Sequence, residues 1–277
     1  MVQGGIQQER KWLPNEFKKT LDLYKSSLEA SKTSNLVVWP EVAIPSIANN
    51  LDHYLDDLKK VVKENQIQLL LFGILTSDEG SGTIRNSMMA IGSSDVVYHK
   101  RHLLPFGEYF PVPDIVRSWL QSMGLPNRDI GHGKDIQSMP KLGNILIAPS
   151  ICYEDIFGSE LLGYFPKANL LVNITNNAWF GKSFASEQHF QMSRMRAIET
   201  GRYLLRATNT GVTAIVGPIG NVQRRAEPFK YSLLLGTYEP MIGTTPYIKY
   251  GNSLIVILMI LSLFLGYSLI RNRQSYR

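Results

Sequence analysis

The hydrophobic pattern of the first 250 residues alternates between helical and extended periods. Apolar side chains recur every three to four positions in stretches that we expect to be helical, and continuous apolar runs bounded by Gly, Pro or Asn predict buried strands. Helices are predicted over 15–31, 47–64 and 185–201, with a shorter one near 158–165. Strands are predicted over 36–39, 67–75, 87–92, 96–100, 144–151, 168–175, 203–208, 212–218 and 232–238. This alternation predicts an α/β fold.

The C-terminal pattern is different. Residues 252–270 contain no charge over nineteen positions, and a helix of that length is about 28 Å long, close to the hydrocarbon thickness of a bilayer. Tyr247 and Tyr250 precede the run at an interface position. We therefore expect one folded domain over 1–248, and a transmembrane helix with a short basic tail over 249–277. A buried core helix is the alternative interpretation.

The placement of charged residues predicts how the C-terminal helix is oriented in the membrane. The chain has 277 residues and a net charge of +6, and Lys249, Arg271, Arg273 and Arg277 supply four of those positive charges. An excess confined to one end is not the patch or stripe of a nucleic-acid footprint, so no nucleic-acid partner is predicted. Basic residues collect on cytoplasmic flanks. We expect the C-terminus in the cytoplasm and residues 1–250 on the outer side, and the lack of an apolar export signal after Met1 suggests that upstream sequence is missing.

The single cysteine is the first candidate for chemistry. One thiol excludes an intramolecular disulfide framework and a Cys-rich zinc site. Cys152 ends an apolar strand and precedes helix signals, and a nucleophile on such a turn sits at the edge of a sheet beside backbone N–H groups that can bind an oxyanion. The alternative is a small buried core residue.

A cysteine nucleophile needs a base or cation to form its thiolate. The five histidines leave a Cys/His dyad open: His53, His99, His102, His132 and His189. A second possibility is that Glu41 and Lys100, which also follow strands, converge with Cys152 on one sheet edge. Nearby, residues 103–140 are rich in Pro, Gly and apolar side chains, which predicts either a functional lid or binding loop or a satellite core cluster. The apolar positions are Leu103, Leu104, Phe106, Tyr109, Phe110, Val112, Ile115, Trp119 and Leu120.

Four stretches carry a resemblance. VVWPEVAIP, YHKRHLLPFGEYFP, ICYEDIFG and NITNNAWFG resemble the signature segments of the nitrilase superfamily (carbon–nitrogen hydrolases), and within it the apolipoprotein N-acyltransferase family. The resemblance implies a nitrilase-like αββα sandwich followed by one C-terminal transmembrane helix. It implies a triad in which Glu41 is the general base, Lys100 stabilises the oxyanion and Cys152 is the nucleophile.

Five further residues match positions that the family uses near its site: Glu108, Glu154, Tyr153, Trp179 and Trp12. Glu108 could orient Lys100 or be a surface acid. Glu154 could position Glu41 or a backbone N–H, or be a favourable acid at a helix N-terminus. Asn177 departs from the pattern, because an acid is common there. Four arginines, solvated or ion-paired, receive no role: Arg194, Arg196, Arg202 and Arg206.

The implied activity is acyl transfer from a phospholipid, through a Cys152 thioester, to the N-terminal amine of a diacylglyceryl-cysteine apolipoprotein, at the bacterial inner membrane with the catalytic domain on the periplasmic face. No metal and no cofactor are implied. The alternatives are a membrane-tethered amidase or nitrilase-type hydrolase and an inactive truncated remnant. Full-length members carry several transmembrane helices before this domain, so a separate N-terminal multi-span fragment is a further expected partner.

Overall fold

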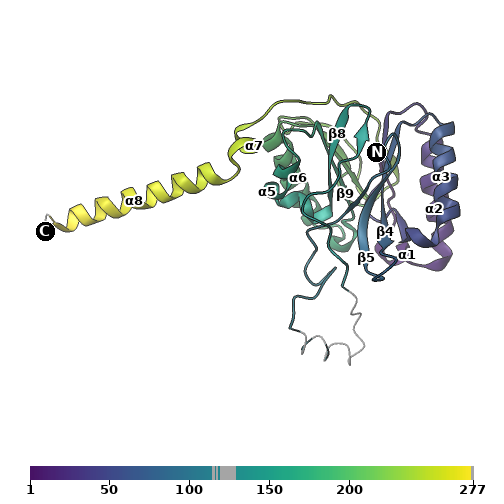
Figure 1. The fold of residues 1–277 in the computed structure, drawn as a ribbon, viewed down its shortest axis with the longest axis horizontal. Coiled ribbons are helices and arrows are strands. Elements are labelled where there is room, and N and C mark those ends of the chain that lie inside the picture. The colour runs from purple at the N-terminus through teal and green to yellow at the C-terminus, as the bar shows by residue number, and fades with distance from the viewer. Residues whose placement is uncertain (114–115, 117, 119–128, 276–277) are drawn as a thin grey trace.

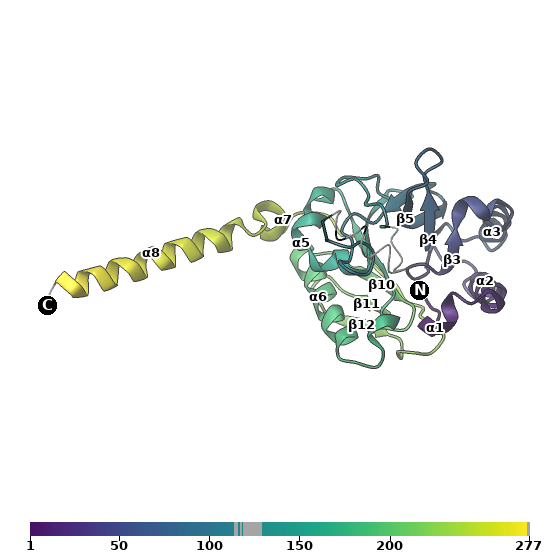
Figure 2. The same ribbon diagram turned by 90° about the horizontal axis from the view of Figure 1, so that it is seen from below.

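Two β-sheets lie face to face, with helices on both outer surfaces (Figures 1 and 2). The computed structural model describes residues 1–113, 116, 118 and 129–275. The first sheet has the order β2-β4-β5-β6, with β3 also paired to β4. Its strands are β2 (Leu36–Val38), β3 (Ile44–Ile47), β4 (Leu69–Ser77), β5 (Ile84–Gly92) and β6 (Val97–His99). Strands β2 and β3 run parallel to β4, whereas β4 pairs antiparallel with β5, and β5 pairs antiparallel with β6.

The second sheet has the order β12-β11-β10-β9-β8-β7, and its central strands β8, β9 and β10 are parallel. Its strands are β7 (Lys141–Leu142), β8 (Ile145–Ile151), β9 (Leu170–Thr175), β10 (Leu204–Thr208), β11 (Ala214–Val216) and β12 (Val222–Arg225). A small separate ladder joins β1 (Val2–Gln3) to β13 (Ser232–Leu233). The α-helices are α1 (Gln8–Lys11), α2 (Pro14–Glu29), α3 (Asp52–Glu64), α5 (Gly158–Leu161), α6 (Ala185–Thr200), α7 (Pro246–Tyr250) and α8 (Ser253–Ser275), and four short 3-10 turns are η1 (Ala48–Asn50), η2 (Cys152–Ile156), η3 (Leu162–Tyr164) and η4 (Ala178–Phe180).

Strand β4 shows how the sequence pattern builds the layers. Its first seven residues, Leu69–Leu75, carry no polar side chain, and the first six of them are buried, as expected for a strand with both faces covered. Leu70 and Phe72 pack in one core with the inner faces of α2 and α3, and Leu69 and Leu71 pack in the other core against the second sheet. Helix α6 covers the second sheet from outside, through Phe190 and Ala197 among others. The expected αββα sandwich is therefore present.

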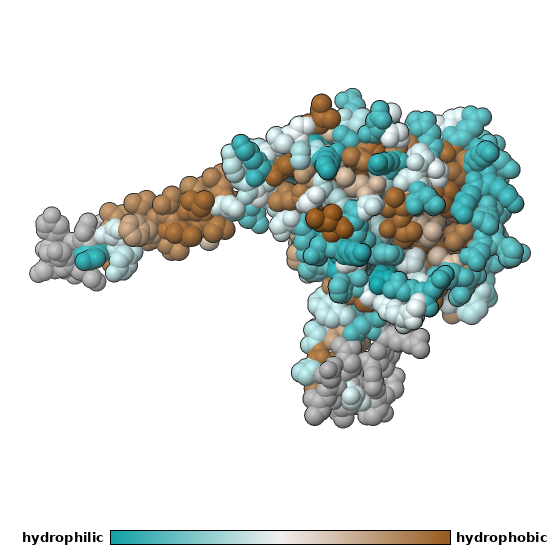
Figure 3. All heavy atoms as spheres, viewed as in Figure 1, coloured by the Kyte–Doolittle hydropathy of each residue, from teal (hydrophilic) through white to brown (hydrophobic). Residues whose placement is uncertain are grey.

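Helix α8 leaves the sandwich and extends alone, with an apolar surface along most of its length (Figures 1 and 3). The segment Ser253–Arg271 has a mean hydropathy of 2.5 and none of it is buried, and no other helix in the part of the chain that the structure describes is long and apolar enough to cross a membrane. The core-helix interpretation of this run is wrong, because nothing in the described chain packs around it.

Two of the predicted elements differ in the structure. The strand predicted over 232–238 is reduced to Ser232–Leu233, because its only partner β1 ends at Gln3 where Gly4 and Gly5 follow. The helix predicted over 47–64 begins at Asp52, because Ile47 is held extended by pairing with Leu75 and a 3-10 turn intervenes. The short elements β3, β12, α1 and α7 carry too little periodicity to be predicted.

The two longer described parts of the excursion, 103–113 and 129–140, contain no helix or strand, which fits the expectation of an irregular segment, whereas Val116 and Ser118 between them are helical. Ile115, Trp119 and Leu120, three of the apolar residues of the expected lid, lie outside the described residues.

Candidate active site

Three strand ends bring Glu41, Lys100 and Cys152 to one edge of the sandwich. Glu41 lies in the turn after β2, Lys100 directly follows β6, and Cys152 follows β8 as the first residue of η2. The Lys100 Nζ lies 3.6 Å from the Glu41 Oε1, and both side chains are almost fully buried. The edge is the carboxyl end of the parallel strands, where ligands bind in open α/β folds.

The Glu41 carboxylate is fixed by donors from both sheets. Its Oε1 accepts a hydrogen bond of 2.7 Å from the side chain of Asn86 on β5, and its Oε2 accepts one of 2.7 Å from the backbone N–H of Asn176 after β9. The sequence reasoning missed both residues. Asn86 is a polar residue inside an apolar strand, and Asn176 lies within the NITNN run, so each had a signal in the sequence.

Lys100 is held between two carboxylates. Its Nζ lies 2.8 Å from Glu108 Oε2, and Glu108 also accepts hydrogen bonds from Asn86 and from the backbone N–H of Leu104. Burial acts to lower the pKa of Lys100, but the charges of Glu41, Cys152 and Glu108 outweigh it and raise that pKa. Lys100 is therefore a permanent cation, and the expected ion pair with Glu108 is present. We call Glu41, Asn86, Lys100, Glu108 and Cys152 the reactive cluster.

Cys152 sits on a strained turn. Its φ of 53° lies in the left-handed region, which a non-glycine residue occupies only where the surroundings hold it. Its thiol is free. Burial raises the pKa of the Cys152 thiol to about 12, with Glu41 adding to the rise and Lys100 opposing it. The site therefore holds the sulfur as a thiol, which becomes a nucleophile only when a base removes its proton.

Glu154 is completely buried and serves the backbone around the site. It accepts hydrogen bonds from the backbone N–H groups of Ile151 (2.6 Å) and Arg101 (2.7 Å) and from the hydroxyl of Tyr98 (2.9 Å). Burial raises the pKa of Glu154 despite these donors. Of the roles open from the sequence, the one supported here is hydrogen bonding to N–H groups, which joins the Lys100 segment to the Cys152 turn.

A second buried cluster lies behind the cysteine turn and was not foreseen. Asp155 Oδ1 lies 2.8 Å from His189 Nε2, and its Oδ2 accepts hydrogen bonds from Ser193 Oγ (2.5 Å) and Arg206 Nη1 (2.6 Å). We call Asp155, His189, Ser193 and Arg206 the bracing cluster. Arg206 Nη1 also donates to Asn173 Oδ1, and the Asn173 amide donates to the backbone carbonyl of Cys152, so the cluster reaches the turn through one intermediary.

The histidines do not assemble a Cys/His dyad. His99 Nδ1 lies 2.8 Å from Ser87 Oγ, His102 Nδ1 lies 2.8 Å from Glu160 Oε1, and His189 belongs to the bracing cluster. Within the described residues no hydrogen bond joins a histidine to Cys152. Asn177, which departs from a family pattern in which an acid is common, is buried, and its Oδ1 lies 3.2 Å from His189 Nδ1.

The aromatic residues singled out from the sequence occupy different depths. Tyr153 is half-buried and lies beside the His102 ring, at 5.6 Å between ring centres. Trp12, which follows α1, is 52% exposed, and Trp179 in η4 is 73% exposed. The two tryptophans do not pack into the sandwich. Among the described residues, no group of three or more His, Cys, Asp or Glu side chains is placed to hold a metal ion.

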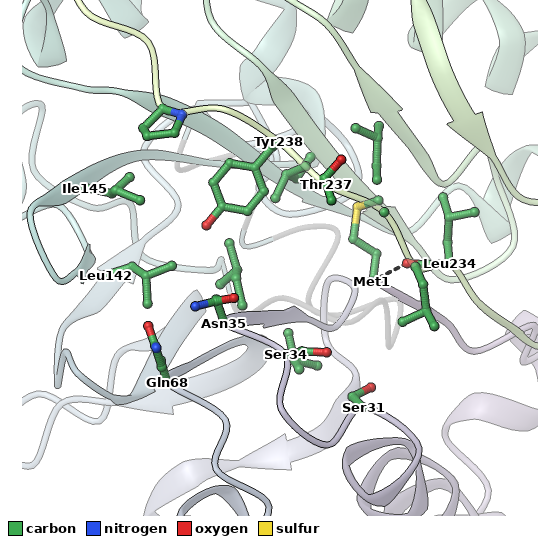
Figure 4. Close-up of a pocket in the computed structure, with 17 residues that line it drawn as sticks. Met1, Ser31, Ser34, Asn35, Gln68, Leu142, Ile145, Leu234, Thr237 and Tyr238 are labelled. Atoms are coloured by element: carbon green, nitrogen blue, oxygen red, sulfur yellow. Dashed lines mark hydrogen bonds between the residues drawn. The ribbon is translucent and has the colours of Figure 1, made fainter.

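A cavity of about 390 Å³ lies away from this site (Figure 4). It is lined by Leu36 and Val37 at the start of β2, Ile145 at the start of β8, and Tyr238, among others. These are the amino ends of the parallel strands, opposite the carboxyl ends that carry Glu41, Lys100 and Cys152. The cavity therefore does not mark the position of Cys152.

Comparison with known proteins identifies relatives. The carbon–nitrogen hydrolase family model matches residues 1–247. An apolipoprotein N-acyltransferase from Methylococcus capsulatus is 37% identical over 253 residues, which cover 91% of this chain and 50% of that protein. One from Nitrosomonas europaea is 38% identical over 268 residues, covering 96% of this chain and 54% of that protein. The chain thus spans about half the length of these curated relatives.

Solved structures share the fold. A mutant amidase from Nesterenkonia sp. AN1, with the acetamide moiety of fluoroacetamide on its active-site cysteine, superposes with a TM-score of 0.60 at 17% identity, covering 83% of this chain and 86% of that chain. A carbon–nitrogen hydrolase from Helicobacter pylori G27 gives a TM-score of 0.58 at 16% identity, covering 83% and 85%. At such identities the likeness establishes the fold alone.

Proposed function

Because this chain belongs to the carbon–nitrogen hydrolase family, we propose that it is an N-acyltransferase that moves a fatty acyl chain from a phospholipid to the N-terminal amine of a diacylglyceryl-cysteine apolipoprotein. The observation that carries the proposal is the convergence of Glu41, Lys100 and Cys152 on one buried edge. The relatives named apolipoprotein N-acyltransferase supply the substrate class.

In the first half-reaction, the Cys152 sulfur attacks the carbonyl carbon of the lipid ester while the Glu41 carboxylate takes the thiol proton. The negative charge that develops on the carbonyl oxygen of the ester is stabilised by the Lys100 ammonium. The C–O bond then breaks, and Glu41 returns its proton to the departing glycerol oxygen. The products are a lysophospholipid and a thioester on Cys152.

In the second half-reaction, the α-amine of the apolipoprotein attacks the thioester carbon. Glu41 accepts the proton that the amine loses, the C–S bond breaks, and the sulfur is reprotonated from Glu41. An amide bond is formed and the resting thiol is restored. Two products leave in two separate steps, so the kinetics are ping-pong.

The membrane placement belongs to the same proposal. Helix α8 spans the bilayer, the sandwich lies on the periplasmic face, and Arg271 and the basic tail lie in the cytoplasm. A reporter fused after Arg277 then has to be cytoplasmic. We also propose that a separate multi-span segment presents the lipid, since an acyl chain leaving the bilayer loses about 0.8 kcal/mol for each methylene exposed to water.

The direct test is mass spectrometry of the intact chain after incubation with phospholipid in detergent micelles. We expect one added acyl mass that neutral hydroxylamine removes, no addition in Cys152→Ala, and little in Cys152→Ser, because an alkoxide is harder to form than a thiolate. Because Cys152 is the only cysteine, acylation that persists in Cys152→Ala contradicts the mechanism.

A diacylated lipopeptide added afterwards separates the candidate functions. Transfer of the acyl mass to its N-terminus supports the acyltransferase. Release as free fatty acid favours the alternative, a membrane-tethered amidase or nitrilase-type hydrolase in which water replaces the amine. Failure to form any thioester, even when a multi-span segment of a relative is co-expressed, favours the inactive remnant.

A further inference from the structure

Lys11 is a second buried lysine at the reactive cluster that the proposed mechanism leaves unused. It is the last residue of α1, and only 3% of it is exposed. Lysines are seldom fully buried unless paired with an acid. No ion pair within 4.0 Å among the described residues includes Lys11, although such pairs are present for Lys100. The polar partner of Lys11 is instead the backbone carbonyl of Glu41, which accepts a hydrogen bond from its Nζ at 3.1 Å.

The surroundings of Lys11 connect it to the reacting groups. Burial lowers the pKa of Lys11 to about 8, while the charges of Glu41 and Cys152 act in the opposite direction. The ammonium is therefore close enough to interact with both groups. A buried cation with one neutral acceptor costs free energy, so its position calls for a compensating role at this site.

The turn that Lys11 contacts is strained. Val42, directly after Glu41, has a φ of 46°, a conformation that a β-branched residue adopts only under constraint. On one side the turn is held by β4, where the Gly73 N–H donates to the Pro40 carbonyl at 3.1 Å. A side chain at Gly73 would collide with the backbone of this turn, so the two segments are in close contact. The Lys11 ammonium, at the end of α1, adds a second contact to this turn through its hydrogen bond to the Glu41 carbonyl.

We propose that Lys11 is a positioning residue for the catalytic base: its hydrogen bond to the Glu41 carbonyl fixes the strained turn and so aims the Glu41 carboxylate at the cysteine. This inference rests on the proposed function, in which Glu41 takes the thiol proton. Because Lys11 forms no ion pair with the Glu41 carboxylate and bonds its backbone carbonyl instead, it acts through the position of Glu41. Misplacement of a reacting group by about 1 Å can cost about a hundredfold in rate.

A double-mutant cycle tests the coupling. The measured quantity is the maximal rate of Cys152 acylation by p-nitrophenyl butyrate in detergent, followed by nitrophenolate release and intact mass, for Lys11→Met, Glu41→Gln and the double variant. We expect Lys11→Met to lower this rate by about tenfold to a hundredfold with little change in the half-saturating ester concentration. In the Glu41→Gln background the same change should have an effect below about twofold. Lys18→Met, at an exposed position of α2, is the matched control.

The outcomes separate the possible failures. Equal losses from Lys11→Met in both backgrounds would mean that Lys11 acts on the substrate or the thiol directly, and an unchanged rate would mean that it has no role; either result overturns the proposal. If Glu41→Gln alone has no effect, the proposed base is wrong whatever Lys11 does. Should Lys11→Met not fold, Lys11→Gln keeps a donor in a similar volume, and its smaller loss must also vanish in the Glu41→Gln background.

Discussion

The reactive cluster and the bracing cluster are both buried and both charged, yet they differ in how their charges are balanced. In the bracing cluster one carboxylate, that of Asp155, receives donors from three side chains. In the reactive cluster one ammonium, that of Lys100, lies between two carboxylates and beside a thiol. The first arrangement satisfies its central group, whereas the second leaves negative charge that can accept a proton. Only the second is suited to proton transfer.

The two neighbouring acids Glu154 and Asp155 make the same contrast within η2. Burial raises the pKa of Glu154, whereas for Asp155 burial is outweighed by His189 and Arg206, which lower its pKa. For Glu154 the backbone N–H groups, the charge of Lys100 and the Tyr98 hydroxyl do not offset burial, whereas for Asp155 the charges of His189 and Arg206 and the hydrogen bonds from His189 and Ser193 do. Direct contact with His189 and Arg206 therefore keeps Asp155 an anion.

Removing the cation of the bracing cluster should have the largest effect. Arg206→Met leaves Asp155 buried with only His189 and Ser193, and breaking a buried ion pair costs about 3–5 kcal/mol. We expect the free energy of unfolding in urea to fall by that amount. Arg224→Met, on the exposed strand β12, is the control and should leave it within about 0.5 kcal/mol. An unchanged unfolding midpoint in Arg206→Met would show that the cluster does not support the fold.

Removing the cation of the reactive cluster, Lys100, should lower the rate of Cys152 acylation. Lys100→Met deletes the proposed oxyanion donor, which we expect to cost about 3–4 kcal/mol of transition-state stabilisation, or roughly a hundredfold to a thousandfold in single-turnover acylation of Cys152. The rate is expressed per folded molecule to separate it from stability. His99→Asn and His102→Asn should cost far less. A large loss in a histidine variant together with a near-normal rate in Lys100→Met would overturn the assignment.

These two cations also mark what the sequence could predict. Lys100 was predicted because a charged residue directly after an apolar strand is visible in the local pattern, and the resemblance joined it to Glu41 and Cys152. Arg206 received no role, because its partner Asp155 lies 51 positions away in the sequence and no local period connects them. The position of Lys11 was not predicted for the same reason, because its hydrogen-bond acceptor lies 30 positions away in the sequence.

The elements follow the same rule. Buried strands such as 67–75 and 168–175 were predicted because their apolar runs are long, and they correspond to β4 and β9. The extent of β13 depends on where β1 ends, and the start of α3 depends on the pairing of β3 with β4. Such boundaries are set by tertiary pairing, which a local hydrophobic pattern does not contain.

Opposite pKa shifts give Glu154 and Asp155 opposite pH dependences of stability. The pKa of Asp155 is below its ordinary 3.8, so its contribution is present above that pH and is lost as the pH falls through the lowered value. The pKa of Glu154 is above its ordinary 4.5, so its contribution is complete below that pH and is lost as the pH rises through the raised value. Glu154→Gln removes some hydrogen bonds and should cost about 1–3 kcal/mol at low pH.

The measurement is urea unfolding of the wild type and Glu154→Gln from pH 4.5 to pH 8. Because only the wild type has the ionisable group, the stability difference between the two should shrink as the pH rises. A difference that grows with pH would mean that the buried carboxylate is stabilised as an anion, as Asp155 is, and would remove the contrast.

The smallest expected effect concerns the uncompensated negative charge of the reactive cluster. Glu41 contributes to the raised pKa of Cys152, so neutralising it should lower that pKa and increase the thiolate fraction at pH 8. We expect Glu41→Gln to raise the rate of Cys152 alkylation by iodoacetamide by about two- to tenfold while it slows acylation by an ester, because alkylation needs only the thiolate and acyl transfer needs the base. Glu9→Gln, an exposed acid on α1, should change neither rate. Since the chain has a single cysteine, intact mass reports this site alone.

A fall in both rates would mean that Glu41 already holds the thiol proton in the resting site and that the sulfur is a thiolate beside Lys100. The reactive cluster would then be balanced by an ion pair in the same way as the bracing cluster.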